Sequence, residues 1–244
     1  MGEHKVTVDY ERPSPYAGPE PGSVRDRITS FRLGLAYRQY RRLLTRFAGL
    51  NPEEAVTILE VGVGSGYLLG LMEQWFPRAQ IEGLEYDARL IDRISQRVTR
   101  STVHQGSAEE LPFADGQFDA VISLHLIEHL YRPEAMVREA FRVLKPGGSL
   151  ILATPNPEGL AARWLGPRWE GFSPDHVSLR SPREWSGLLS AQRFVPLAGG
   201  TTGLSGFPAF RRFPLAILNG GALLVFGWFP WRWGEAYVGA WRRP

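Results

Sequence analysis

Three titratable side chains, His125, Glu128 and His129, stand close together in the segment H-L-I-E-H. Imidazole and carboxylate groups often accept or deliver protons near neutral pH, so the segment could supply a general base. Offsets of three and four residues put all three side chains on one face if the segment is helical. An acid and a further imidazole follow at Asp175 and His176. We expect His129 or His176 to act as a base or to contact a bound substrate.

A glycine-rich turn follows a short apolar run earlier in the chain. Residues 58–68 read I-L-E-V-G-V-G-S-G-Y-L, with glycines at positions 62, 64 and 66. Glycine lets the backbone adopt positive φ and approach a ligand without a Cβ atom in the way. A strand, a glycine loop and a helix in this order typically bind a nucleoside-containing cofactor. The dinucleotide fingerprint has glycine at its sixth position, where this chain has Tyr67.

The tight glycine spacing, with Glu60 just before the loop, resembles motif I of the class I S-adenosylmethionine (SAM)-dependent methyltransferases. In that family the loop lies beside the methionyl part and the ribose of SAM. A second apolar segment, residues 80–85 (Q-I-E-G-L-E), ends at Glu85. An acid about 20 residues past the glycines can accept hydrogen bonds from two ribose hydroxyls. The resemblance therefore implies SAM as the cofactor and Glu85 as a ligand of its ribose.

Three later segments resemble the same family in the same order. Residues 103–113 (V-H-Q-G-S-A-E-E-L-P-F) are similar to the G-D-A-E-x-L-P-F segment that cups the adenine, with Ser107 in place of the acid. Ser107 or Glu109 is therefore expected to meet the adenine amino group. Residues 118–124 (F-D-A-V-I-S-L) supply a strand, and residues 142–148 (R-V-L-K-P-G-G) match the family closely. The cofactor-binding residues implied by the resemblance are Glu60, Gly62, Gly64, Ser65, Gly66, Glu85, Tyr86, Ser107, Ala108, Glu109 and Leu124.

The H-x-x-E-H pattern also resembles E-x-x-E-H of metal-assisted O-methyltransferases, such as those of the ubiquinone pathway and the small-RNA 2′-O-methyltransferases. In those families the motif binds a divalent cation that lowers the pKa of the acceptor hydroxyl. His125 replaces the first acid here, which would suit zinc or a transition metal better than magnesium. We expect a metal-free site, with His125, Glu128 and His129 as the candidate ligands if a metal binds.

The elements that must position these residues alternate along the chain. The patterns predict an α/β protein with a Rossmann-like, doubly wound and mostly parallel sheet of seven strands, the last antiparallel, with helices on both faces. Strands are predicted at the start of the glycine motif and at 80–85, near 103, at 118–124, 149–154, 194–199 and 235–242, and helices at 65–75, 87–100, 133–144 and 182–192.

The N-terminal residues predict two different segments. Residues 1–23 are expected to be a flexible arm, since residues 13–22 contain four prolines. Residues 24–244 are expected to form one methyltransferase domain. Within residues 24–50, apolar residues such as Ile28, Phe31 and Leu35 recur at helical spacing among seven arginines. They predict a helix or helix pair that packs on the sheet edge over the cofactor site, or alternatively a basic face that meets an anionic surface.

Residues 206–233 predict an apolar, tryptophan-rich insertion. A membrane-spanning helix needs about 20 apolar residues, and Pro214, Pro230 and a Gly-Gly pair interrupt this stretch. An aromatic hairpin that dips into the bilayer interface, or covers an apolar acceptor site, fits better, with core packing or a dimer surface as the alternative. Trp164 and Trp169 are expected either to pack in the core or to line the acceptor pocket.

The amino-acid composition excludes several kinds of site and partner. The 244 residues include no cysteine, which excludes disulfides, thiolate metal sites and cysteine nucleophiles and fits a cytoplasmic protein. The N-terminal residues show no signal-peptide pattern. Lys and Arg exceed Asp and Glu by only 28 to 25, so no nucleic-acid partner is expected.

The sequence thus predicts a SAM-dependent methyltransferase that methylates an oxygen of a small or lipid-like acceptor. Peripheral contact with a membrane is expected to run through residues 206–233. An NAD(P)-dependent oxidoreductase is the alternative among enzymes, disfavoured by Tyr67 in the glycine position. The alternative outside enzymes is a catalytically silent, membrane-associated binding protein on a methyltransferase scaffold.

Overall fold

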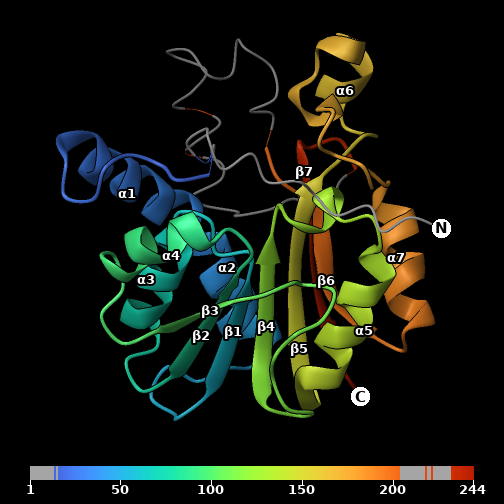
Figure 1. Ribbon diagram of the computed structural model, residues 1–244. Coiled ribbons are helices and arrows are strands. Elements are labelled where there is room, and N and C mark those ends of the chain that lie inside the picture. The colour runs from blue at the N-terminus through green and yellow to red at the C-terminus, as the bar shows by residue number, and fades with distance from the viewer. Residues whose placement is uncertain (1–13, 15, 204–217, 219–220, 222–231) are drawn as a thin grey trace.

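A seven-stranded sheet forms the centre of the protein in a computed structural model that describes residues 14, 16–203, 218, 221 and 232–244 (Figure 1). The strand order is β3-β2-β1-β4-β5-β7-β6, and β7 is antiparallel to both of its neighbours. This confirms the predicted doubly wound sheet with a reversed last strand. The strands are β1 (Thr57–Val61), β2 (Gln80–Glu85), β3 (Thr102–Gln105), β4 (Phe118–Leu124), β5 (Leu144–Pro155), β6 (Val195–Thr201) and β7 (Ala236–Arg242).

Helices cover both faces of the sheet (Figure 1). Successive strand residues point to opposite faces, so Ile58 joins the apolar cluster under α3 and α4, whereas Leu59 joins the cluster under α5 and α7. The helical segments are α1 (Val24–Ala36), α2 (Arg38–Arg42), the π-helical η1 (Leu43–Phe47), α3 (Tyr67–Trp75), α4 (Ala88–Ser95), the 3-10 turn η2 (Ile127–His129), α5 (Pro133–Val143), α6 (Leu160–Leu165), the 3-10 turns η3 (Gly166–Arg168) and η4 (Glu170–Phe172), and α7 (Pro182–Ala191).

The functional residues predicted from sequence fall where the strand order reverses. From β1 the chain continues to β2 and β3 on one side, and from β4 it continues to β5 on the other. Loops that leave two such neighbouring strands diverge, and open α/β sheets bind ligands in the crevice between them. The glycine loop follows β1 and the H-L-I-E-H segment follows β4, so both lie at this crevice.

Helix α4 ends at Ser95, five residues earlier than the predicted end at Arg100. The carboxylate of Glu73 in α3 accepts hydrogen bonds from the backbone N–H groups of Thr99, Arg100 and Ser101, which therefore leave the helix. Burial would raise the pKa of Glu73, but these donors lower it to about 2.

Helix α1 forms as predicted, but the prediction that its apolar face packs on the protein is wrong. Ile28 and Phe31 are 56% and 69% exposed, whereas the buried residue of α1 is Asp26. Farther along, Tyr40, Leu43 and Leu44 do pack in the core. The periodicity therefore located the helical segment and its apolar stripe correctly but not the direction in which the first part of that stripe faces.

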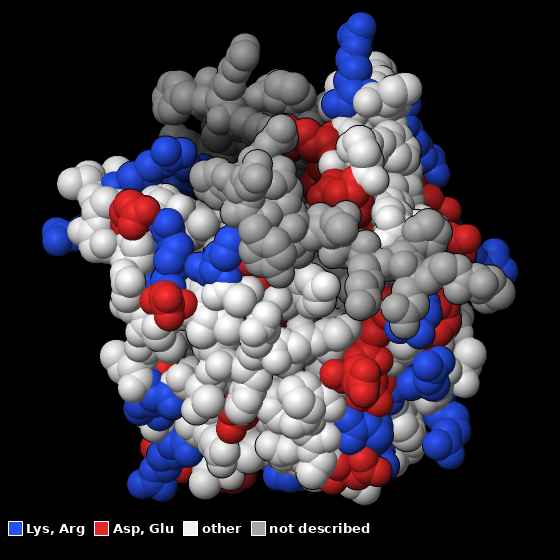
Figure 2. Space-filling model, in the orientation of Figure 1, with Lys and Arg blue, Asp and Glu red and all other residues white. Residues whose placement is uncertain are grey.

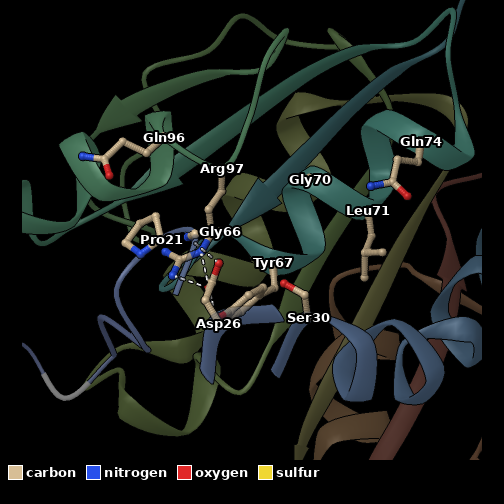
Figure 3. A pocket seen from close by; sticks show the side chains of 11 residues that line it. Pro21, Asp26, Ser30, Gly66, Tyr67, Gly70, Leu71, Gln74, Gln96 and Arg97 are labelled. Carbon is tan, nitrogen blue, oxygen red and sulfur yellow. Dashed lines mark hydrogen bonds and ion pairs between the residues drawn. The ribbon is translucent and has the colours of Figure 1, made fainter. Parts of the chain in front are cut away.

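A buried ion pair explains the orientation of α1. Asp26 accepts hydrogen bonds from Tyr67 Oη (2.5 Å) and Arg97 Nη2 (2.8 Å) (Figure 3). Arg97 also donates to the backbone carbonyls of Ser65 and Pro19, so one guanidinium joins α1, the glycine loop and residues 16–22. Burial would raise the pKa of Asp26, but the Tyr67 and Arg97 donors hold it below its usual value. We call Asp26, Tyr67 and Arg97 the loop latch.

The loop latch lines a cavity of about 240 Å³ between α1, α3 and α4 (Figure 3). This cavity lies behind the glycine loop and includes none of the residues that the sequence assigned to catalysis. Of the predicted arm at residues 1–23, positions 1–13 and 15 lie outside the described residues; residues 16–22 form no helix, and Glu20 forms an ion pair with Arg93 of α4.

The predicted apolar insertion, residues 206–233, lies outside the described residues except at positions 218, 221, 232 and 233. Among the residues that are described, no helix is both long and apolar enough to cross a bilayer.

Removal of the cation of the loop latch should destabilise the fold. We expect Arg97→Ala to lower the free energy of unfolding by about 2–4 kcal/mol, because Asp26 would stay buried without its cation. The matched control is Arg93→Ala, which removes the exposed pair with Glu20 and should cost less than about 1 kcal/mol. Urea unfolding followed by circular dichroism measures both. Equal losses for the two variants would contradict the assignment.

Candidate functional site

The glycine loop is held tightly between β2 and the segment after β4. Gly62 adopts φ 81°, and its N–H donates to the carbonyl oxygen of Leu84 (2.8 Å). A Cβ atom at position 62 would lie 2.9 Å from the side chain of Leu126. Gly66, at φ 82°, passes similarly close to Ile94 of α4. Only glycine fits these two positions, which explains the spacing that the sequence shows.

Glu85 stands at the carboxyl end of β2 with its carboxylate fixed from two sides. Its Oε2 accepts a hydrogen bond from Gly64 N–H (2.7 Å), and its Oε1 accepts one from Asp87 N–H (2.9 Å). A carboxylate can accept about four hydrogen bonds, so each oxygen retains capacity for a further donor. Tyr86, the next residue, is 48% exposed. The arrangement can accept hydrogen bonds from a diol at the crevice.

Glu60 is buried at the end of β1 without a full set of partners. The residue is only 4% exposed, and its Oε2 has no hydrogen-bond donor in the part of the chain that the structure describes. Burial, and secondarily the charge of Glu85, raise the pKa of Glu60 well above its ordinary value. An unsatisfied buried acceptor is costly unless a ligand supplies the donor.

Of the two polar residues that the sequence suggested after β3, Ser107 and Glu109, only Ser107 keeps a donor available for a ligand. The carboxylate of Glu109 is paired with Arg132, whose Nη2 lies 2.7 Å from Oε2. Ser107 Oγ accepts a hydrogen bond from the N–H of Glu109 (3.2 Å), and its hydroxyl proton is left for another acceptor. Ala108 is buried, and Leu124 at the end of β4 packs against the core beneath the crevice.

The H-L-I-E-H segment is not an α-helix, so its three titratable side chains do not share one helical face. His125 adopts φ 53°, and a 3-10 turn covers only residues 127–129. Glu128 is buried and accepts a hydrogen bond from Thr154 Oγ1 (3.1 Å), while the His125 side chain is half-exposed at 3.5 Å from Glu128 Oε1. The His125 and Glu128 side chains therefore have different access to solvent.

His129 and His176 meet at the crevice although they are far apart in the sequence. Their ring centroids are 4.8 Å apart in an edge-to-face arrangement. His129 Nδ1 lies 3.1 Å from the carbonyl oxygen of Asp175, and His176 Nδ1 lies 2.7 Å from that of Gly171. A carbonyl can only accept, so each Nδ1 is the donor in this arrangement, and in the neutral imidazole with this tautomer Nε2 carries the lone pair.

Glu128, His129 and His176 could also offer ligand atoms to a metal ion. One atom from each lies within 4.8 Å of the other two. The sequence suggested His125, Glu128 and His129 as metal ligands. In the structure His176 takes the place of His125 in this group.

Tyr16 and Asp175 complete this cluster, and the sequence reasoning missed the role of Tyr16. The Tyr16 hydroxyl donates to Asp175 Oδ2 (3.2 Å), and its ring meets the edge of His129. Burial, with the charge and hydrogen bond of Asp175, raises the pKa of Tyr16 to about 12. The feature of the sequence that could have pointed to Tyr16 is its position as an aromatic residue in a proline-rich segment that leads into α1.

Trp164 and Trp169 have different environments in the structure. Trp169 is buried and donates to Glu235 Oε1 (2.6 Å), which fits the packing role, whereas Trp164 is 81% exposed.

Comparison with known proteins agrees with this geometry. A family model described as a methyltransferase domain matches residues 59–152. A "probable S-adenosylmethionine-dependent methyltransferase" of Mycolicibacterium smegmatis is 37% identical over 117 residues, which are 48% of this chain and 42% of that protein. The demethylmenaquinone methyltransferase of Thermotoga maritima is 28% identical over 201 residues, covering 82% of this chain and 76% of the relative.

Solved structures show the same fold at low identity. A geranyl diphosphate methyltransferase in complex with GPP and sinefungin has a TM-score of 0.59 at 16% identity, over 85% of this chain and 79% of that one. The chain spans about half the length of the first curated relatives, 42% and 56%.

The strand order, the glycine loop and these relatives agree on one family. The match over residues 59–152 includes the loop, Glu85 and the H-L-I-E-H segment. The relatives named here are methyltransferases and not oxidoreductases. Residues 59–152 thus form a methyltransferase domain similar to those of the class I SAM-dependent methyltransferases, and the cofactor that this domain implies is S-adenosylmethionine.

Proposed function

We propose that this protein transfers the methyl group of SAM to an oxygen atom of a small or lipid-like acceptor. The observation that carries the proposal is the position of two sets of residues at the same crevice. Glu60, Glu85 and the glycine loop lie on its β1–β2 side, and His129 with Asp175 lies beyond β4. Bound SAM would supply an activated methyl group on a sulfonium, so the protein has to align the acceptor and accept its proton.

The residues at the β1–β2 side fit the cofactor. Glu85 would accept hydrogen bonds from the ribose hydroxyls, and Ser107 would meet the adenine. The unpartnered oxygen of Glu60 would accept a hydrogen bond from the cationic amino group of the methionyl part. A cation near Glu60 would favour its charged form and offset the burial that raises its pKa.

His129 is the proposed general base. Its Nδ1–H is directed at Asp175, which leaves Nε2 to accept the proton of an acceptor hydroxyl. Tyr16 donates a hydrogen bond to the Asp175 carboxylate and so holds this acid in place. His176 and the half-exposed His125 would contact the acceptor. The proposed proton transfer needs no metal, so activity should survive treatment with EDTA.

The relatives support an apolar acceptor. The names of the Thermotoga maritima relative and of the solved structure specify demethylmenaquinone and geranyl diphosphate. We propose that residues 206–233 form the apolar insertion that admits such an acceptor and touches the membrane, in a cytoplasmic protein.

Loss of the Glu85 carboxylate should weaken cofactor binding. We expect Glu85→Ala to reduce the affinity for S-adenosylhomocysteine on the order of 10- to 100-fold, the effect of hydrogen bonds to a charged acceptor. Isothermal titration calorimetry measures this. Glu82→Ala, on the same strand but paired with His104, is the control and should bind as the wild type does. Absence of binding by the wild-type protein would refute the proposed function.

Glu60 should destabilise the protein in the absence of cofactor. Because its pKa is raised in the folded state, the folded protein holds a proton that the unfolded chain releases above about pH 4.5. Stability is therefore lost as pH rises from that value toward the raised pKa. Glu60→Gln should remove this loss and raise the melting temperature at pH 8 more than at pH 5. It should also weaken cofactor binding. An equal shift at both pH values would contradict the assignment.

Replacement of the proposed base should slow turnover and spare cofactor binding. We expect His129→Ala to lower kcat on the order of 100-fold or more, measured with radiolabelled SAM and a lipid extract of the source organism. His104→Ala is the control, since His104 pairs with Glu82 away from the crevice. An unchanged kcat for His129→Ala would exclude it as the base.

A further inference from the structure

Helix α1 carries its apolar stripe on the side that faces solvent. Val24, Ile28 and Phe31 follow the i, i+4, i+7 spacing of one helical face and are 73%, 56% and 69% exposed. The opposite face buries Asp26 in the loop latch and presents Ser30 to the cavity behind the glycine loop. The loop latch therefore fixes α1 with its apolar stripe outward.

Three exposed arginines, Arg25, Arg27 and Arg32, flank this stripe. None of them has an acidic partner among the residues that the structure describes. The sole acid of α1 is Asp26, which is already paired with Arg97. The exposed face of α1 is thus an apolar ridge with positive charge on both sides.

A second protrusion has the same composition. Trp164 of α6 is 81% exposed, and Arg163 and Arg168 beside it are exposed too. Helices α1 and α6 both lie on the side of the sheet where β4 ends (Figure 1). Figure 2 shows Lys and Arg atoms over α1 and at the tip of α6. Segments more than 100 residues apart in the sequence thus place similar residues on the same side of the molecule.

We infer that α1 and the tip of α6 form a docking surface for an anionic lipid bilayer. A helix with a narrow apolar stripe and flanking arginines lies in the plane of a membrane interface, with the guanidinium groups at the headgroups. Tryptophan favours the same depth. The positive charge selects an anionic surface, and the convex ridge of α1 fits a fluid layer that can deform around it.

This surface would turn the crevice toward the membrane. The loop latch that orients α1 also binds the carbonyl of Ser65 in the glycine loop, so the docking helix and the cofactor loop share one support. The inference does not depend on methyl transfer, since it concerns where the protein binds and not what it catalyses.

Vesicle cosedimentation of the full chain tests the inference. Wild-type protein should bind vesicles of phosphatidylcholine and phosphatidylglycerol in roughly equal parts, about tenfold or more tightly than phosphatidylcholine alone, and high salt should weaken this binding. The Ile28→Ser/Phe31→Ser variant should lose at least about tenfold in partitioning. The Arg25→Gln/Arg27→Gln/Arg32→Gln variant should lose on the order of 100-fold.

The control variant is Val195→Ser, which changes a half-exposed apolar residue on β6 and should bind as the wild type does. Circular dichroism and urea unfolding confirm that each variant is folded. Equal binding to both vesicle types would overturn the inference. So would wild-type binding by the Ile28→Ser/Phe31→Ser variant, which would place membrane contact in residues 206–233. A dimer of the wild type that this variant abolishes would show instead that the stripe binds a second copy of the chain.

Discussion

The contact between Arg97 and Asp26 is the interaction on which the site depends. The guanidinium is buried and reaches a carboxylate of α1, a carbonyl of the glycine loop and a carbonyl of the N-terminal arm. A buried charge of this kind is costly unless all of its partners are in place. The three segments can therefore be expected to order together. Tyr67, which stands where a dinucleotide site has glycine, adds a hydroxyl to the same carboxylate.

The charges at the crevice suit a cationic cofactor. Glu60, Glu85 and Glu128 are each less than a tenth exposed and lie at the ends of β1 and β2 and just past β4. A nearby cation favours the ionised form of these acids, including Glu60, and a carboxylate in a poorly hydrated crevice attracts such a ligand more strongly than it would in water. Methyl transfer removes the positive charge of the sulfonium. The acids that favour binding of SAM would thus bind the product less tightly, because its sulfur is a neutral thioether, and this would favour release of the product.

Much of this arrangement could be predicted from the sequence, because it depends on the spacing of residues within short segments of the chain. Glu85 is found at a strand end about 20 residues after the glycines in folds of this type, and the structure places it there. The contact of Tyr16 with Asp175 joins residues 159 positions apart and has no local pattern. The outward stripe of α1 was missed for a related reason. Periodicity locates a stripe, but the partner of Asp26, 71 residues away, decides which way it faces.

The contact between Gly62 and Leu126 links the two halves of the crevice. Any side chain at position 62 would displace Leu126, and Leu126 lies in the segment that carries Glu128 and His129. The glycine loop and the turn after β4 are consequently complementary surfaces rather than independent modules. The turn after β4 could be exchanged with that of another methyltransferase to alter the choice of acceptor. Such an exchange would have to keep a residue of leucine's shape at position 126, because a different shape would disturb the glycine loop and with it the binding of the methyl donor.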